Sequence, residues 1–213
     1  MLRVDFVHDL VCPWCRIGLA NLEAAIRSRP DLGVEVAYRP FLLDPTVPAA
    51  GLPYRQTLAR KLGGEARLPS IWARVEEAGL RAGVRFAFER IETMPSTLLA
   101  HALVAGVPPR AAGALVHALH EAHFLEGKDL GDRTVLASVG ARATGLEADE
   151  LLALLSDEGL VERVAAEARE AGRRGIHGVP FFVVGGRYAL EGAQPPEVLA
   201  RALDEAARAS TST

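Results

Sequence analysis

The chain has 213 residues, of which 49% are hydrophobic and 24% are charged, a composition typical of a globular protein with a buried core. Its formal net charge of −3 argues against a basic nucleic-acid-binding surface. No run of residues approaches the roughly 18 apolar positions needed to cross a membrane. Charged residues such as Arg3 and Asp5 interrupt the N-terminal segment where a secretion signal is apolar. We therefore expect a cytoplasmic protein with neither nucleic-acid nor membrane partners.

The first fifty residues carry alternating strand and helix signals. Residues 2–7 are rich in branched and aromatic side chains and predict a strand. A helix is predicted over 13–29, because apolar residues recur there at helical spacing until proline and glycine end the pattern. Residues 34–39 alternate again and predict a second strand. The proline-rich stretch 40–53 predicts an ordered loop.

Residues 54–174 follow a different pattern, in which leucine and alanine recur at helical spacing between glycine and proline breaks. The pattern predicts a block of five or six helices. Asp132 and Ser156 are candidate N-caps, because a short polar side chain can accept hydrogen bonds from the free N–H groups of a helix start.

Strand signals return near the C-terminus. Residues 181–184 are β-formers, and Gly185-Gly186 is typical of a two-residue hairpin turn before a return strand over 187–191. Two prolines then open a last helix that runs to about residue 208.

The predicted order is β-α-β, a helical insertion, then β-β-α, a mixed α/β fold in which the two ends of the chain pack together. We predict one domain from residues 1–53 and 175–213. The helical block, 54–174, is a second domain inserted into it. Because the insertion must leave and re-enter beside the sheet, we expect it to roof the functional site and to select the substrate.

The strongest chemical signal is the pair Cys12 and Cys15, the only cysteines in the chain, in the motif Cys-Pro-Trp-Cys. The motif lies where the first strand passes into the first helix, and the free N–H groups and dipole of a helix N-terminus stabilise a thiolate. Cys12 is at that end and is expected to be exposed, with Cys15 one turn inside. We predict that Cys12 attacks a substrate sulfur to form a mixed disulfide, which Cys15 then resolves.

A zinc half-site and two inert cysteines are the alternative interpretations. Zinc needs two further ligands, and no second cysteine pair exists. His8 and His101 are available, but their spacing is not typical of a metal site. His117, His120 and His123 recur at i, i+3 and i+6, which turns the third side chain away from the first. This spacing favours a solvated or partly packed helix face, and we predict no metal.

The second signal is Gly178-Val179-Pro180-Phe181-Phe182, a proline that begins a strand. Opposite a Cys-X-X-Cys helix, thioredoxin-like folds place a cis-proline, so we predict a cis Val179–Pro180 bond beside Cys12. That geometry turns the Val179 backbone toward an extended substrate segment. An ordinary trans-proline at a strand start is the alternative.

Taken together, these motifs resemble the DsbA-like thioredoxin superfamily, and in particular its cytoplasmic FrnE-like branch. The resemblance covers nearly the whole chain, and the matching stretches are 9–15, 39–45, 96–101, 178–182 and 192–196. It implies a thioredoxin-like fold interrupted by an all-helical insertion domain, with the active site in the cleft between them. It also implies dithiol–disulfide exchange by Cys12 and Cys15 beside a cis Pro180. Ser96-Thr97 replaces the family's Asn-Thr, so contacts from the insertion to substrate are expected to differ.

The candidate substrate-binding residues are Pro13, Trp14, Thr97, His101, Val179 and Gln194. Trp14 offers an apolar platform beside the cysteines. His101 faces the cleft by analogy with the family, and a buried histidine with a structural role is the alternative. Asp9, three residues before Cys12, either holds a proton for the leaving thiol or caps the active-site loop.

The predicted function is disulfide exchange with a protein or small-molecule substrate. The alternative is glutathione-dependent isomerisation, as in hydroxychromene-carboxylate isomerases and kappa-class glutathione transferases. Those relatives typically have serine at the position of Cys12, and an isomerase that binds glutathione needs no resolving thiol such as Cys15. A redox-inactive binding or chaperone-like module is the third interpretation. No cofactor is expected beyond the cysteine pair itself. Glutathione as a co-substrate and a homodimer both stay open.

Overall fold

The two ends of the chain share one four-stranded sheet in the computed structural model, which describes residues 1–211. The strands are β1 (Leu2–His8), β2 (Val34–Pro40), β5 (Phe181–Val184) and β6 (Tyr188–Glu191), in the order β2-β1-β5-β6. β1 pairs in parallel with β2 and antiparallel with β5, which pairs antiparallel with β6. The predicted mixed α/β arrangement of the two ends is therefore present.

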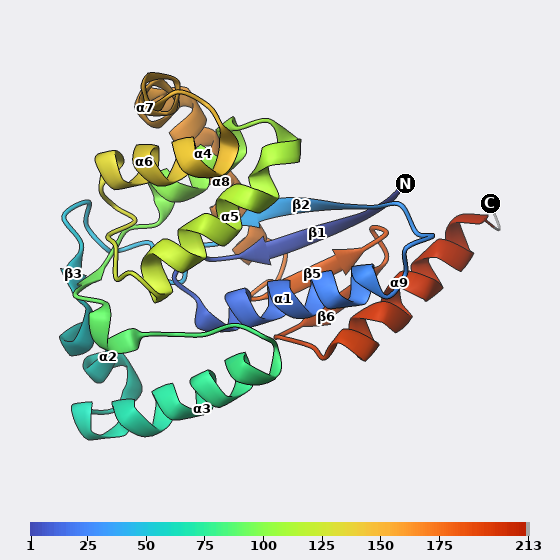
Figure 1. Ribbon diagram of the computed structural model, residues 1–213, viewed down its shortest axis with the longest axis horizontal. Helices are drawn as coiled ribbons and strands as arrows, with labels where there is room; N and C mark the ends of the chain where they lie inside the picture. Colours follow the sequence, from blue (N-terminus) through green and yellow to red (C-terminus); the bar gives the residue numbers. More distant parts are fainter. Residues whose placement is uncertain (212–213) are drawn as a thin grey trace.

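Helices α1 (Pro13–Arg27) and α9 (Pro196–Thr211) pack side by side against this sheet (Figure 1). Val4 and Phe6 of β1 and Phe182 of β5 are fully buried in the layer between sheet and helices. The rings of Phe6 and Phe182 stack with centroids 5.1 Å apart. This layer holds the start of α1 in place above the strands.

Seven α-helices lie between β2 and β5 in the described part of the chain: α2 (Tyr54–Leu62), α3 (Leu68–Arg81), α4 (Leu98–Gly106), α5 (Pro109–Phe124), α6 (Arg133–Thr144), α7 (Ala148–Ser156) and α8 (Glu158–Arg173). Five or six were predicted. The additional helix arises because residues 82–97, which separate α3 from α4, contain a short 3₁₀ turn and the two-residue strand β4 (Thr93–Met94). β4 pairs with β3 (Leu52–Pro53), so the block is helical apart from this short strand.

The helical block and the sheet share one hydrophobic core. A single cluster of buried residues joins Phe6 and Cys15 to Leu103 of α4, Leu115 of α5 and Leu151 of α7. α8 packs against β2, and α3 and α5 contact α1. The predicted boundaries at 53/54 and 174/175 stay a prediction, since no break in this core marks them.

Local turn and cap signals had mixed outcomes. The N–H of Arg187 donates to the Val184 carbonyl across Gly185 and Gly186, whose φ angles are +60° and +67°, so the predicted hairpin is present. The return strand begins at Tyr188, one residue later than predicted, because Arg187 completes the turn.

Of the two predicted N-caps, one is confirmed. The Asp132 carboxylate accepts hydrogen bonds from the N–H groups of Thr134 and Val135 at the start of α6. Ser156 is instead the last residue of α7, and its hydroxyl donates to the Leu152 carbonyl. Asp157, the next residue, caps α8 in its place.

Candidate active site

The Cys-Pro-Trp-Cys motif forms the first turn of α1. Cys12 has extended backbone angles at the N-cap position and Pro13 occupies the first turn, where its missing N–H has no intrahelical partner to lose. The Cys12 carbonyl accepts the N–H groups of Cys15 and Arg16 at 3.0 and 3.3 Å. The Cys12 N–H donates to the Asp9 carbonyl at 3.1 Å, which fixes the turn that leads from β1. The first turn of α1 contains no acidic residue.

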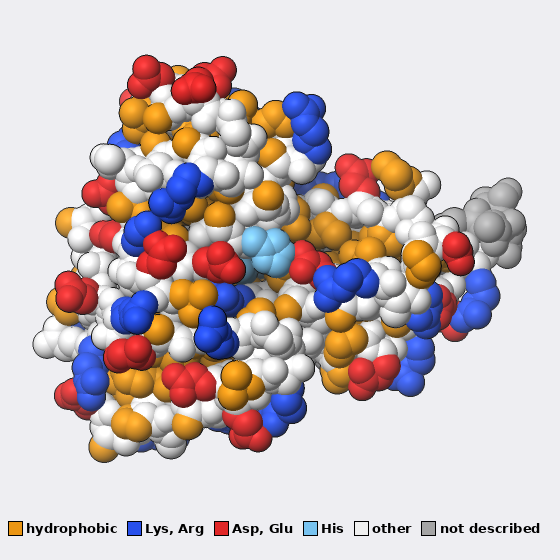
Figure 2. Space-filling model, viewed as in Figure 1, with side chains coloured by type: hydrophobic (Ala, Val, Ile, Leu, Met, Phe, Trp, Pro, Cys, Tyr) orange, Lys and Arg blue, Asp and Glu red, His pale blue; other side chains and the backbone are white. Residues whose placement is uncertain are grey.

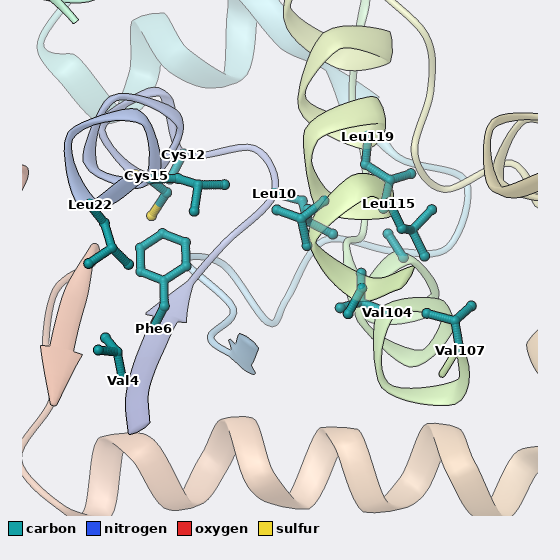
Figure 3. Packing of buried hydrophobic residues seen from close by; sticks show 14 of the residues in the cluster. Val4, Phe6, Leu10, Cys12, Cys15, Leu22, Val104, Val107, Leu115 and Leu119 are labelled. Carbon is teal, nitrogen blue, oxygen red and sulfur yellow. The ribbon is translucent and has the colours of Figure 1, made fainter. Parts of the chain in front are cut away.

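Both thiols are free and the two cysteines lie 3.4 Å apart. Cys12 is 4% exposed and Cys15 is fully buried beside the ring of Phe6 (Figure 3). The predicted order of accessibility holds, but the expectation of an exposed Cys12 is wrong. Burial, reinforced by the neighbouring Cys12, raises the pKa of the Cys15 thiol well above its ordinary value. Cys15 therefore keeps its proton at neutral pH until something removes it.

The loop before β5 brings Pro180 against α1. The Val179–Pro180 bond is cis, as predicted, and the Cys12 thiol donates to the Val179 carbonyl with Sγ 3.7 Å from the oxygen. These two residues are 167 positions apart in the chain. Gly18, in the second turn of α1, packs directly on the proline: a Cβ at Gly18 would lie 2.8 Å from Pro180 Cγ. The absence of a side chain there lets the helix and the loop approach each other.

Buried polar side chains gather behind the cysteines. They are His8, Asp9, Arg16, His101, His120 and His123. Rings of His8 and His101 lie 5.1 Å apart, and those of His8 and His120 lie 6.3 Å apart. Burial lowers the pKa of His8 and His120 well below the ordinary value and that of His123 to about 4. These three imidazoles are therefore neutral at pH 7.

Arg16 places a cation directly after the motif. Its Nη1 donates to the His120 carbonyl at 2.9 Å, and its guanidinium lies 5.6 Å from the centroid of the Phe86 ring. Burial lowers the pKa of this guanidinium from its ordinary value. Arg16 thus ties α1 to α5 from inside the core.

The predicted substrate-binding residues have diverse surroundings. Pro13, Trp14 and Val179 are half-buried around Cys12, and Trp14 packs between the two largest hydrophobic clusters. Thr97 and His101 are buried, because α4 packs into the core at its N-terminal end. His101 borders a pocket on the other side from the thiols.

Gln194 lies in the loop between β6 and α9. Its side-chain amide donates to the Glu191 carbonyl, and its backbone carbonyl accepts from Asn21 of α1. Neither of these hydrogen bonds involves Cys12 or Cys15. Its predicted role in substrate binding stays a prediction.

The three histidines of α5 do not share one environment. His117 is 46% exposed at its side chain and bonds to Glu23 of α1, whereas His120 and His123 are buried. Within residues 1–211, no group of His, Cys, Asp and Glu side chains has the geometry of a metal site. On the helix face that carries these three histidines, two side chains are therefore packed in the interior and one is partly exposed to solvent.

Sequence reasoning missed Gly18, Arg16 and the burial of His8 and His120. A glycine inside a predicted helix is a signal of close packing, and it was present at Gly18. Arg16 and the histidines carried no comparable signal, because their burial depends on how α5 meets α1.

The surface gives few further indications of function. On the face shown in Figure 2, acidic and basic side chains are interspersed, without a large region of one sign. Within the described residues, none of the helices has both the length and the apolar character of a membrane-spanning segment.

Comparisons with known proteins identify the family. Residues 3–204 match the DSBA-like thioredoxin domain. A probable DsbA oxidoreductase from Streptomyces coelicolor is 31% identical, with a TM-score of 0.86 over 97% of this chain and 90% of its own. No curated protein matches the chain.

Two solved structures of lower identity share the fold. The cytosolic disulfide reductase DsbM from Pseudomonas aeruginosa, with glutathione, is 21% identical with a TM-score of 0.61, covering 99% of this chain and 98% of its own. A 2-hydroxychromene-2-carboxylate isomerase is 17% identical with a TM-score of 0.67 at the same coverage. The thioredoxin-like fold with a helical insertion is therefore confirmed, and the FrnE-like branch stays a prediction. The chain belongs to the DsbA-like thioredoxin family.

Proposed function

We propose that this protein is a dithiol–disulfide oxidoreductase in which Cys12 attacks and Cys15 resolves. The observation that carries the proposal is the position of Cys12, at the N-terminus of α1, with Cys15 3.4 Å away and the Val179 carbonyl in hydrogen-bond contact. A helix N-terminus stabilises a thiolate at the position of attack. A second thiol directly behind it is what release of a mixed disulfide requires.

The Cys12 thiolate attacks one sulfur of a substrate disulfide, forms a Cys12–S–S–substrate bond and releases the other substrate sulfur as a thiolate. Cys15 loses its proton and attacks the Cys12 sulfur, which releases the second substrate thiolate. The substrate gains two electrons and the cysteine pair is oxidised to a disulfide. The reverse sequence oxidises a substrate dithiol.

Cys15 distinguishes this proposal from glutathione-dependent isomerisation. An isomerase of that type holds a glutathione thiolate without changing its oxidation state, and a second protein thiol within 3.4 Å has no task in such a reaction. We include glutathione as a candidate co-substrate, since a DsbM that shares the fold was solved with it.

The chain also presents an apolar side chain for a polypeptide substrate. Leu43 is 48% exposed, and its backbone N–H donates to Asp9, the residue that anchors the active-site turn. Protein disulfides are therefore within the proposed substrate class. A cytoplasmic location is part of the proposal, and cell fractionation with an antibody to the protein tests it.

The test is a pair of single substitutions at the motif. Cys15→Ser should accumulate a covalent Cys12–substrate adduct, visible as added mass that dithiothreitol removes, with oxidised glutathione or with partners from cell extract. Cys12→Ser should form no adduct and lose exchange altogether. If Cys15→Ser, supplied with glutathione, keeps a full rate of isomerisation, the glutathione-dependent isomerase is supported instead. A redox-inactive binding module would be supported by two results together: Cys12→Ser binds a partner as tightly as the unmodified protein, and the unmodified protein carries out no disulfide exchange.

A further inference from the structure

A buried carboxyl–imidazole pair lies behind the thiols and is not used in the exchange as written above. The side chains of Asp9 and His101 are each 2% exposed, and Asp9 Oδ1 lies 3.5 Å from His101 Nε2. Neither atom has a hydrogen-bond partner. The other carboxyl oxygen, Oδ2, accepts the Leu43 N–H at 2.8 Å and so holds Oδ1 toward the histidine. Buried polar atoms are normally satisfied, so two that face each other without a bond require an explanation.

Asp9 also contacts the redox pair. Its carbonyl accepts the Cys12 N–H, and its carboxylate is close enough to act on the charge of the Cys15 thiol. Asp9 is therefore adjacent to the proton that Cys15 must lose before it attacks Cys12.

His101 approaches solvent on its other side. A pocket of about 530 Å³ lies between β2 and helices α4, α5 and α8, and His101 lines it with Tyr38, Val104, Pro109 and Leu160. Nε2 of His101, the ring atom that faces Asp9, is buried and has no hydrogen-bond partner. The imidazole therefore reaches from the pocket to Asp9.

We propose that Asp9 and His101 form a relay that carries the Cys15 proton between the buried dithiol and this pocket. The inference rests on the proposed exchange reaction and adds a route for its proton. His101 comes from the helical insertion, so the insertion supplies a functional group to the chemistry of the sheet domain. His101 is a positioning and relay residue that does not touch the substrate.

Over one full turnover, Cys15, Asp9 and His101 all return to their starting protonation states. When Cys15 attacks, its proton passes to the Asp9 carboxylate, then from Asp9 to Nε2 of His101, while the proton on Nδ1 leaves to water in the pocket. His101 now holds its proton on Nε2. When the disulfide is reduced again, water protonates Nδ1, and the Nε2 proton returns through Asp9 to Cys15. An imidazole can do this because each ring nitrogen can give or accept a proton.

Other ionisable groups surround the pair. His8 of β1 and both His120 and His123 of α5 interact with it inside the protein, and Arg16 of α1 lies beside His120. The three histidines are neutral near pH 7, and the Arg16 guanidinium is held by the His120 carbonyl. The charged groups on the pocket walls are Arg3, Glu35, Arg39, Arg163 and Glu167.

The alternative is that the pair only holds α4 against the turn before α1. The two roles are separable with Ellman's reagent, a diaryl disulfide that releases a coloured thiolate at each step. The first release reports attack by Cys12, and the second reports resolution by Cys15. Both are recorded by stopped flow on the reduced full-length protein from pH 5 to 9.

We expect Asp9→Asn and His101→Gln to leave the first release within about twofold of the unmodified protein. Both should slow the second release about 100-fold near pH 7, the usual size of a lost proton-transfer partner, and shift its pH profile upward. Asp204→Asn of α9 and His117→Gln of α5 are the matched controls, because each removes the same functional group in a remote ion pair. Both controls should leave the two releases unchanged.

His101→Ala keeps the inference testable if a polar replacement disturbs folding. It opens space beside the pocket, and added imidazole should restore the second release at least about tenfold without changing the first. Slowing of both releases to the same extent, or an unchanged second release with an unchanged pH profile, would overturn the relay. Failure of imidazole to restore the rate in folded His101→Ala would overturn it too. If the unmodified protein gives no second release, the exchange reaction itself is wrong.

Discussion

Gly18→Ala tests whether contact between α1 and the Pro180 loop is as close as the structure shows. The new Cβ would lie 2.8 Å from Pro180 Cγ and 3.2 Å from both Pro180 Cβ and Phe182 Cζ. A proline ring cannot rotate away as a flexible side chain can, and Phe182 is fully buried. Either the helix or the loop beside Cys12 must therefore move by several tenths of an ångström.

The magnitude follows from two opposing terms. Overpacking a close-packed core costs about 1–3 kcal/mol. Replacing glycine by alanine inside a helix gains about 1 kcal/mol through helix propensity. The net expectation is a loss of up to about 2 kcal/mol in the free energy of unfolding, or up to roughly 8 °C in melting temperature for a chain of this length.

Gly172→Ala in α8 is the matched control, because it is a helical glycine whose added Cβ would have no neighbour within 4 Å. It should raise stability by about 0.5–1 kcal/mol. Urea denaturation followed by circular dichroism measures both variants, and alkylation of Cys12 by iodoacetamide reports on the loop. If Gly18→Ala is as stable as Gly172→Ala, the close contact does not exist and the argument for the site geometry fails with it.

Three further predictions follow from separate features. His123 has its folded pKa lowered to about 4, so the unfolded chain binds a proton first as pH falls below about 6.5 and stability is lost until about pH 4. Urea denaturation at pH 7.5 and at pH 5 measures this loss. Between these two pH values, the free energy of unfolding of His123→Leu should fall by about 2 kcal/mol less than that of the unmodified protein. Equal falls would contradict the burial of His123 as a neutral group. Asp132→Ala removes two hydrogen bonds to the start of α6 and should lower stability by about 1 kcal/mol in the same assay, whereas no change would show that the cap is replaced by water. Leu43→Ser should lower kcat/KM about tenfold on an unfolded protein disulfide and leave turnover of oxidised glutathione unchanged; equal effects on both would remove Leu43 from the substrate-binding surface.

Features set by neighbouring residues were predictable from the sequence. The strand β5 has the predicted bounds because Pro180 and the pair Gly185-Gly186 mark its two ends locally. The cap at Asp132 was predictable for the same reason, since its partners are two and three residues away. Ser156 failed by one position, because Asp157 is the better acceptor for the N–H groups of the next helix.

Features set by packing between distant elements were not predictable. The spacing of His117, His120 and His123 shows that they share a helix. It does not show that His120 and His123 are buried whereas His117 stays partly exposed. The sequence left open whether His101 faces the cleft or is a buried structural histidine, and it gave no sign that the ring would lie 3.5 Å from Asp9. The acid–base pair joins residues 92 positions apart, and one sequence gives no sign of that contact.

The shared core limits how the helical block can act on substrates. Figure 3 shows Leu10, which follows β1, lying between the cysteines and the side chains of Leu115 and Leu119 on α5. Swinging the block away from the sheet would expose these leucines, at about 1.5–3 kcal/mol for each one. We therefore expect substrate to reach Cys12 past the half-buried Val179 and Trp14, without opening of the block. We then expect the block to act as a fixed wall of the site and to influence the reaction through side chains already in place, such as His101 beside Asp9.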